Sequence, residues 1–184
     1  MKVIYLHGLG SSGQSSTAKA LEALGIETIA PTYRPERFKE SIDRLTPFVE
    51  EASVDCIVGT SLGGYYALKL AELTGKRVVA VNACFEPSLY LQKYLDAPAI
   101  NYDTGEPIHF SPAMLSEFEP LNSSVLVDPV VVIGSQDEVI KPEWQRNYCM
   151  EAGWKWIWRE GWGHRVDSVE ELVEMIGKAR LLAN

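Results

Sequence analysis

The sequence predicts an α/β protein with a doubly wound, mostly parallel sheet of about six strands. Short apolar runs alternate with helical patterns along its 184 residues. Most of these runs are nearly continuous in valine and isoleucine, which is typical of parallel strands that helices cover on both faces. Six runs are expected to form strands, at residues 3–6, 26–30, 56–58, 77–81, 129–133 and 154–158.

Helical patterns fill most of the intervals between these strands. Residues 38–52 repeat apolar side chains at helical spacing, and Pro47 is expected to kink or divide this helix. Ser168 and Glu171 form a capping box that starts the last helix. Alternating strands and helices imply right-handed crossovers within one sheet.

The connection formed by residues 82–128 is too long for a simple link between two strands. It contains a helical patch at residues 89–95, a turn-rich stretch at 101–105 and a short helix near 112–118. Because it leaves the carboxyl end of a strand, where such sheets hold ligands, we expect a lid that contributes to a substrate pocket. The whole chain, residues 1–184, is expected to form a single domain with this insertion.

Composition excludes several classes of function. A net charge of −8 argues against nucleic-acid binding, which favours a basic face. The sequence contains no run of 18 apolar residues, so we expect no membrane span. The chain enters a strand at its first residues, leaving no room for a signal peptide, and its three cysteines fit neither a disulfide framework nor a zinc pattern. We therefore expect a cytoplasmic protein without a metal.

A G-x-S-x-G pattern, Gly59-Thr60-Ser61-Leu62-Gly63, is the most informative stretch. It follows the apolar run 56–58 and precedes a helical pattern over 62–73. A strand that turns sharply into a helix lifts the residue at its apex clear of the sheet, and small neighbours are needed because the backbone is crowded there. This context predicts that Ser61 is a nucleophile, whereas the pentapeptide alone would also match ordinary tight turns.

A serine nucleophile needs a base and an acid that orients that base. His164 follows the last predicted strand at the same edge of the sheet as Ser61, whereas His7 ends the first strand and His109 lies in the insertion. Asp137 follows the fifth strand, and its neighbour Glu138 is the main competitor. The order Ser61, Asp137, His164 is that of α/β-hydrolases.

The loop after the first strand, residues 7–13, is expected to help bind an oxyanion. A backbone N–H from Leu9 or Gly10 would act beside that of Leu62. His7 then orients the loop rather than carrying protons. The same loop spells the dinucleotide fingerprint G-x-G-x-x-G, but no acidic residue follows the next strand to bind a ribose hydroxyl.

Aromatic residues suggest where a substrate pocket could lie. Trp154, Trp156 and Trp158 are expected to pack the core and the sheet surface. Trp162 lies two residues before His164, so an acyl pocket is one interpretation of it. Within the insertion, aromatic side chains including Tyr90 and Tyr94 are candidates to face the substrate.

The chain resembles the small bacterial YqiA-like esterases of the α/β-hydrolase superfamily over essentially its whole length. The segments that carry this resemblance are residues 7–12, 61–66, 101–106, 137–139 and 163–164. The resemblance implies a compact α/β-hydrolase with esterase activity, no cofactor, and Ser61, Asp137 and His164 as the triad. Two positions depart from the family pattern. Ala83 stands where we expect proline, and Trp162-Gly163 precedes His164 where family members tend to have a polar residue. Substrate preference is therefore not carried over.

The leading hypothesis is a cofactor-independent esterase that acts on a small-molecule ester through an acyl-enzyme. An acyl thioesterase is the nearest alternative, because the sequence does not separate the two. A non-catalytic binding module of the same fold is a third hypothesis, although such a module has no need of three triad residues. The sequence leaves the oligomeric state open.

Overall fold

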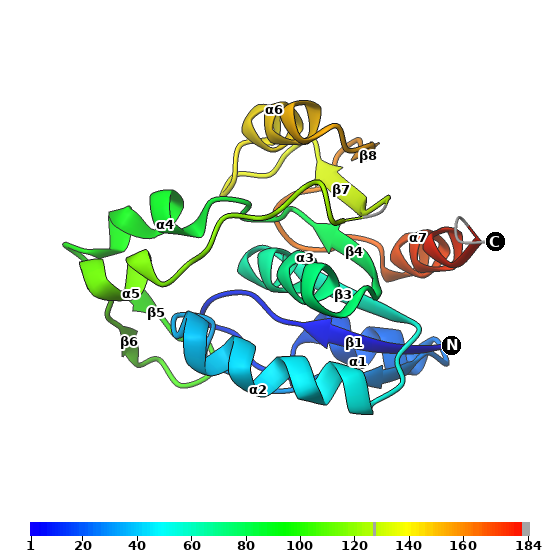
Figure 1. Ribbon diagram of the computed structural model, residues 1–184, viewed down its shortest axis with the longest axis horizontal. Coiled ribbons are helices and arrows are strands. Elements are labelled where there is room, and N and C mark those ends of the chain that lie inside the picture. Colours follow the sequence, from blue (N-terminus) through cyan, green and yellow to red (C-terminus); the bar gives the residue numbers. More distant parts are fainter. Residues whose placement is uncertain (127, 182–184) are drawn as a thin grey trace.

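The computed structural model describes residues 1–126 and 128–181, and its main feature is a six-stranded, wholly parallel sheet (Figure 1). The strand order is β2-β1-β3-β4-β7-β8. These strands are β1 (Lys2–Leu6), β2 (Glu27–Ile29), β3 (Cys56–Thr60), β4 (Arg77–Val81), β7 (Val130–Gly134) and β8 (Trp156–Arg159). All six predicted strands are confirmed, each within two residues at either end.

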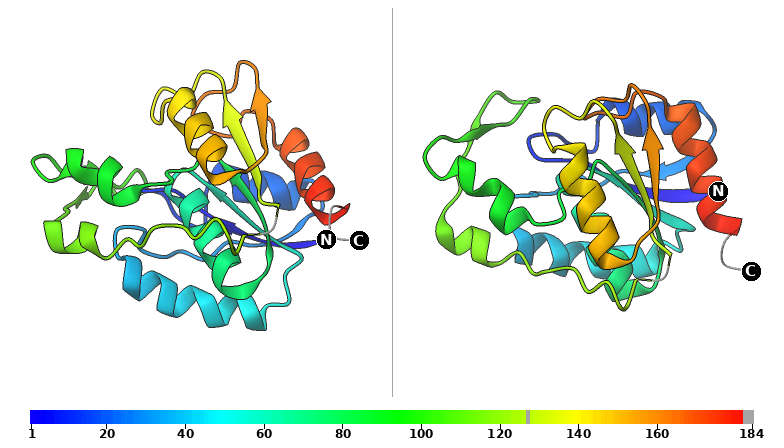
Figure 2. Two further views of the ribbon diagram at one scale, coloured as in Figure 1. Left: turned by 45° about the horizontal axis from the view of Figure 1, so that its top comes forward. Right: turned by 90° about the horizontal axis from the view of Figure 1, so that it is seen from above.

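Helices cover both faces of this sheet (Figure 2). On one face lie α1 (Ser16–Ala23) and α7 (Val169–Leu181), and on the other lie α2 (Phe38–Glu51), α3 (Leu62–Thr74) and α6 (Pro142–Ala152).

Successive side chains of β1 enter two different apolar clusters. Val3 and Tyr5 pack with α1 and α7, whereas Ile4 and Leu6 pack with the helices of the opposite face. Because both faces of the strand are buried, neither can be polar, and this explains the unbroken apolar runs in the sequence.

Helix α2 runs through Pro47 without interruption, so the expected division does not occur. Proline lacks an N–H, and its place in the helix leaves the carbonyl of Asp43 without its usual partner. Both residues are exposed, so water can hydrate that carbonyl. At the start of α7, the Ser168 hydroxyl accepts a hydrogen bond from the Glu171 N–H at 3.2 Å, as a capping box requires.

The insertion contains α4 (Pro87–Tyr90), the 3₁₀ helix η1 (Leu91–Tyr94), an antiparallel pair of strands β5 (Ala99–Ile100) and β6 (Pro107–Ile108), and α5 (Pro112–Ser116). These elements lie beyond the carboxyl ends of the sheet strands (Figure 1). The hairpin was not predicted, because strands of two residues have no detectable periodicity. Its turn depends instead on the Asn101 side chain, which accepts hydrogen bonds from the N–H groups of Asp103 and Thr104 at 2.9 and 3.1 Å.

The return limb of the insertion is tied to α3 by a buried lysine. The Lys69 ammonium lies 2.8 Å from a carboxylate oxygen of Glu72 and 3.1 Å from one of Glu119, and it donates to the Pro120 carbonyl at 3.3 Å. The Tyr65 hydroxyl donates to the Glu119 carbonyl at 2.7 Å. The insertion is therefore fixed to the body where it leads back to β7.

The turn from β3 into α3 is too crowded for any side chain larger than hydrogen at two positions. A Cβ on Gly63 would lie 2.1 Å from the Leu6 carbonyl oxygen, and one on Gly59 would lie 2.0 Å from the Gly63 carbonyl oxygen. Each of these neighbours is backbone, which cannot rotate away. The two glycines of the G-x-S-x-G pattern are thus required by packing.

We therefore predict that Gly63→Ala lowers the free energy of unfolding by at least about 1–3 kcal/mol, since the added methyl group overpacks the turn. Gly177→Ala on α7 is the matched control. Nothing lies within 4 Å of a Cβ there, and alanine favours helix, so this change should stabilise the protein by up to about 1 kcal/mol. Urea denaturation of both variants checks this, and equal stabilities would refute the packing argument.

Candidate active site

Ser61 occupies a strained position between β3 and α3. Its backbone has φ 59° and ψ −125°, a region that residues other than glycine rarely adopt. Main-chain hydrogen bonds hold it there, the longest of them from the Tyr65 N–H to the Ser61 carbonyl at 3.4 Å. The Ser61 N–H donates to the Val81 carbonyl at 2.9 Å, and the Ser61 carbonyl accepts from the N–H groups of Gly64 at 2.9 Å and Cys84 at 3.1 Å. The side chain is partly exposed at the carboxyl edge of the sheet.

The structure brings His164 and Asp137 together. The His164 Nδ1 and the Asp137 Oδ1 are 2.8 Å apart. Because a carboxylate can only accept, Nδ1 carries a proton, and in the neutral ring Nε2 then keeps its lone pair. His164 thus has the tautomer that a general base needs.

Asp137 is buried and held in a fixed orientation by its own loop and by α6. Its Oδ1 accepts hydrogen bonds from the N–H groups of Val139 and Ile140 at 2.9 and 2.8 Å, and its Oδ2 accepts one from the Gln145 side chain at 2.9 Å. Gln145 is fully buried and also donates to the Ile140 carbonyl at 2.8 Å. Sequence reasoning missed Gln145, because no local pattern indicates a contact across eight residues.

Glu138 makes a different contact from its neighbour. Its carboxylate is exposed and accepts a hydrogen bond from the His164 backbone N–H at 3.1 Å, rather than from the ring. Of the two carboxylates that the sequence left in competition, Asp137 is the one bonded to the imidazole.

The loop after β1 lies against Ser61. A Cβ on Gly8 would be 3.2 Å from the Ser61 Cβ and 3.6 Å from its Oγ. In the part of the chain that the structure describes, the N–H groups of Leu9, Gly10 and Leu62 have no hydrogen-bond acceptor. These are the three donors that the sequence suggests for an oxyanion. Within the same residues, no hydrogen bond joins the Ser61 hydroxyl to the His164 ring.

His7 is buried and holds this loop in place. Its Nδ1 donates to the Gly8 carbonyl at 2.9 Å, and its Nε2 accepts from the Tyr33 N–H at 3.4 Å. The Tyr33 hydroxyl donates to the His7 carbonyl at 2.7 Å. Burial lowers the pKa of His7, so the ring is neutral near pH 7. These contacts leave neither ring nitrogen free for proton transfer.

The glycines that imitate a dinucleotide fingerprint have packing reasons of their own. A Cβ on Gly13 would lie 2.0 Å from the Ala30 carbonyl oxygen, and one on Gly10 would lie 2.3 Å from the Ile100 carbonyl oxygen in the hairpin. The Tyr102 N–H also donates to the Gly10 carbonyl at 2.7 Å. The hairpin of the insertion therefore rests directly on the loop beside Ser61.

Asn82 is a second residue whose importance the sequence did not reveal. It follows β4, is fully buried and has a positive φ of 47°. Its side-chain N–H₂ donates to the carbonyls of Gly163 and His164 at 2.8 and 3.0 Å, and its Oδ1 accepts from the Gly134 N–H at 2.8 Å. One side chain thus joins the end of β7 to the loop that carries His164.

The aromatic residues suggested for a substrate pocket have packing contacts of their own. Trp162 is 5 % exposed and packs in the apolar cluster under α7. Its carbonyl accepts a hydrogen bond from the Gln136 N–H where the chain crosses the end of β7, and this holds the residue in place. Tyr94 stacks on Phe110 within the insertion, with ring centroids 5.8 Å apart. The Tyr90 hydroxyl donates to the Val139 carbonyl in the loop of Asp137. None of the three lines the cavity between the insertion and α2, and their role at a substrate pocket stays a prediction.

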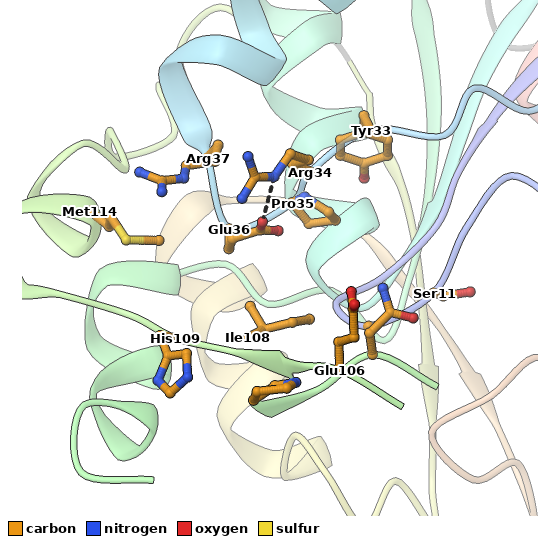
Figure 3. Close-up of a pocket in the computed structure, with 13 residues that line it drawn as sticks. Ser11, Tyr33, Arg34, Pro35, Glu36, Arg37, Glu106, Ile108, His109 and Met114 are labelled. Carbon is orange, nitrogen blue, oxygen red and sulfur yellow. Dashed lines mark hydrogen bonds and ion pairs between the residues drawn. The ribbon is translucent and has the colours of Figure 1, made fainter. Parts of the chain in front are cut away.

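A cavity of about 460 Å³ lies between the insertion and the start of α2 (Figure 3). Residues 33–37 form one wall and residues 106–109 form the other, including the exposed His109. Gly10 and Ser11, from the loop beside Ser61, also line it, together with Asn101 and Met114 of the insertion.

Comparison with known proteins assigns the family and the fold. A family model described as an uncharacterised protein family, UPF0227, matches residues 2–179. The chain belongs to the UPF0227 family. A UPF0227 protein of Yersinia enterocolitica is 22 % identical over 183 residues, which are 95 % of this chain and 96 % of the relative. This confirms the family resemblance seen in the sequence.

Solved structures of low sequence identity share the α/β-hydrolase fold of this UPF0227 chain. Est1E from Butyrivibrio proteoclasticus has a TM-score of 0.73 at 17 % identity, over 98 % of this chain and 87 % of that one. A pyrethroid hydrolase from Sphingobium faniae has a TM-score of 0.72 at 16 % identity, over 100 % and 98 % of the two chains. The predicted fold class is thus confirmed.

Among the residues that the structure describes, no three or more His, Cys, Asp or Glu side chains are grouped so that they could hold a metal ion. No helix within 1–126 or 128–181 is both long and apolar enough to span a bilayer.

We predict that Asn82→Gly lowers kcat by about tenfold to a hundredfold with a smaller change in KM, because it releases the loop that positions His164. Glycine tolerates the positive φ, so this variant removes the side-chain bonds without adding backbone strain. The measurement is ester hydrolysis well below the melting temperature of the variant. Asn82→Asp keeps the acceptor for the Gly134 N–H but loses both donors, so it should be similarly impaired. Wild-type kcat in either folded variant would show that Asn82 does not position the histidine.

Proposed function

We propose that this UPF0227 protein is a serine hydrolase that cleaves carboxylic esters through an acyl-enzyme intermediate and needs no cofactor. The observation that carries the proposal is the buried Asp137 carboxylate bonded to His164 Nδ1, at the sheet edge where the strained Ser61 stands. The α/β-hydrolase fold is consistent with this role, and its solved examples include an esterase and a pyrethroid hydrolase. Fold alone does not fix an activity, so the argument depends on the site.

In the proposed mechanism, Ser61 Oγ attacks the ester carbonyl while His164 Nε2 takes its proton. The fixed Asp137 carboxylate stabilises the resulting imidazolium. The N–H groups of Leu62 and of Leu9 or Gly10, which have no other acceptor in the described chain, would bind the oxyanion. When the tetrahedral intermediate collapses, the bond from the carbonyl carbon to the alkoxide oxygen breaks, and His164 gives that oxygen its proton, so that the alcohol leaves. The same histidine then takes a proton from a water molecule that attacks the acyl-enzyme, and the acid and free Ser61 are released.

This mechanism requires the Ser61 hydroxyl and His164 Nε2 to meet in the substrate complex. Catalytic hydrogen bonds are often long or absent in a free enzyme and tighten when substrate binds. The absence of a Ser61–His164 bond here is therefore compatible with the proposal.

An acyl thioesterase would use the same residues and differ only in its leaving group. A non-catalytic binding module is the alternative from another class. It has no need of an acid held by three hydrogen bonds behind a histidine, and this favours the enzyme. We also propose that the insertion, residues 82–128, acts as the lid of a single hydrolase domain, because its hairpin rests on the Gly10 loop.

Ser61→Ala should reduce ester hydrolysis by at least about a thousandfold while the protein remains folded, because the partly exposed hydroxyl contributes little packing. A fluorophosphonate probe should label the wild type at Ser61 and leave this variant unlabelled. Ser88→Ala, in the insertion, is a control for loss of a serine hydroxyl. Turnover above a tenth of the wild-type rate in Ser61→Ala would exclude Ser61 as the nucleophile.

Asp137→Asn should lower kcat by about a thousandfold or more, because an amide facing Nδ1 disfavours the tautomer that a general base needs. Glu138→Gln should have a much smaller effect, since that side chain meets only the backbone of His164. Steady-state kinetics with an activated aryl ester compares the two variants. The reverse ranking would assign the acid to Glu138.

A further inference from the structure

The cavity between the insertion and the start of α2 contains one cation that has no partner. Four side chains that are charged near pH 7 line this cavity: Arg34, Glu36, Arg37 and Glu106. Arg34 and Glu36 form an ion pair, with the Nε of the arginine 2.9 Å from a carboxylate oxygen. In the part of the chain that the structure describes, the Arg37 side chain makes no ion pair and no hydrogen bond.

The isolation of Arg37 is costly because one of its donors is shielded from water. The Nε of Arg37 is buried and has no acceptor. A buried donor without an acceptor lowers stability, and a charged one does so more strongly. Figure 3 shows the guanidinium groups of Arg34 and Arg37 on the same side of the cavity, across from Ile108 and His109. Arg37 is therefore ready to accept a ligand that supplies an anionic oxygen.

None of the acidic side chains near the cavity forms an ion pair with Arg37 among the described residues. Glu36 is bonded to Arg34, and Glu117 accepts a hydrogen bond from the Lys39 N–H at 3.4 Å. Glu106 is on the opposite wall and exposed, so water screens its charge. Glu106 also makes no ion pair among the described residues, so Arg37 is distinguished by its buried Nε and not by being the one unpaired charge. The whole chain has a net charge of −8.

The loop after β1 connects this cavity to the proposed reaction centre. Gly8 lies against the Ser61 side chain, whereas Gly10 and Ser11 of the same loop line the cavity. In a substrate whose carbonyl oxygen accepts from the N–H groups of Leu9 or Gly10, the part of the molecule beyond the carbonyl group would extend into the cavity. The cavity can therefore hold a part of the substrate that does not react.

We propose that the cavity is a subsite for a carboxylate on the substrate, remote from the scissile carbonyl, and that Arg37 binds it. Guanidinium and carboxylate form two parallel charge-assisted hydrogen bonds, which makes Arg37 selective for an anionic over a neutral group. The proposal rests on the ester hydrolase function and specifies its substrate class. The carboxylate can be on the acyl chain or on the leaving group.

Two pairs of esters distinguish these placements by kcat/KM. For the acyl chain, 4-nitrophenyl hydrogen adipate is compared with 4-nitrophenyl hexanoate, and for the leaving group, 4-butanoyloxybenzoate is compared with its methyl ester. In at least one pair the wild type should favour the anion by about tenfold, the order of one charged hydrogen bond. In Arg37→Met, the ratio of kcat/KM for the anionic ester to that for the neutral ester should fall close to one. Arg146→Met removes the same charge from an exposed position on α6, and there the ratio should stay at its wild-type value.

Binding to a variant without turnover provides an independent test. Ser61→Ala should bind monomethyl adipate more tightly than dimethyl adipate in calorimetry, and adding Arg37→Met should remove the difference. If the wild type prefers the anion in neither pair, or if Arg37→Met leaves its preference intact, the subsite proposal is overturned. If no ester is hydrolysed while monomethyl adipate still binds through Arg37, the subsite stands and the hydrolase function fails.

Discussion

The arrangement of the candidate site depends on how the chain leaves β4. The Val81 carbonyl and the Cys84 N–H hold the Ser61 backbone from both sides, and between them the Asn82 side chain bonds to the loop of His164 and to the end of β7. Four consecutive residues thus connect the segments that carry the proposed nucleophile, acid and base. Because β4 lies between β3 and β7 in the sheet, the residues that follow it can reach all three segments through short main-chain and side-chain hydrogen bonds.

Much of this could be predicted from the sequence, because the informative features are local. Buried parallel strands need apolar side chains on both faces, and the run from Val3 to Leu6 shows this directly. The turn at Ser61 needs glycine at fixed offsets, since backbone approaches backbone there. Asp137 and His164 each follow a strand, and the carboxyl ends of parallel strands share one edge. Topology then brings these two residues together without any knowledge of side-chain contacts.

The features that were missed or misplaced depend on contacts between distant segments. The role of Asn82 comes from hydrogen bonds to backbone groups that are 52 to 82 residues away in the sequence. Without these bonds it would be an ordinary asparagine after a strand. The hairpin β5–β6 is defined by a turn and by its contact with Gly10, not by periodicity. Trp162 is close to His164 in sequence, but its ring packs on the face of the sheet that α1 and α7 cover. Proximity in sequence was a poor guide there, because neighbouring residues of a loop can face different layers.

The insertion is attached to the body at its beginning, middle and end. The Tyr90 hydroxyl bonds to the loop of Asp137, the Tyr102 N–H bonds to the Gly10 carbonyl, and Lys69 holds the return limb on α3. Two of these attachments touch loops that the proposed mechanism uses. An insertion tied in this way cannot move as a rigid flap without breaking its contacts with the Gly10 loop and with the loop of Asp137. On the proposed function, substrate choice would depend mainly on the side chains that line the cavity, where Arg37 lies across from Ile108 and His109 of the insertion.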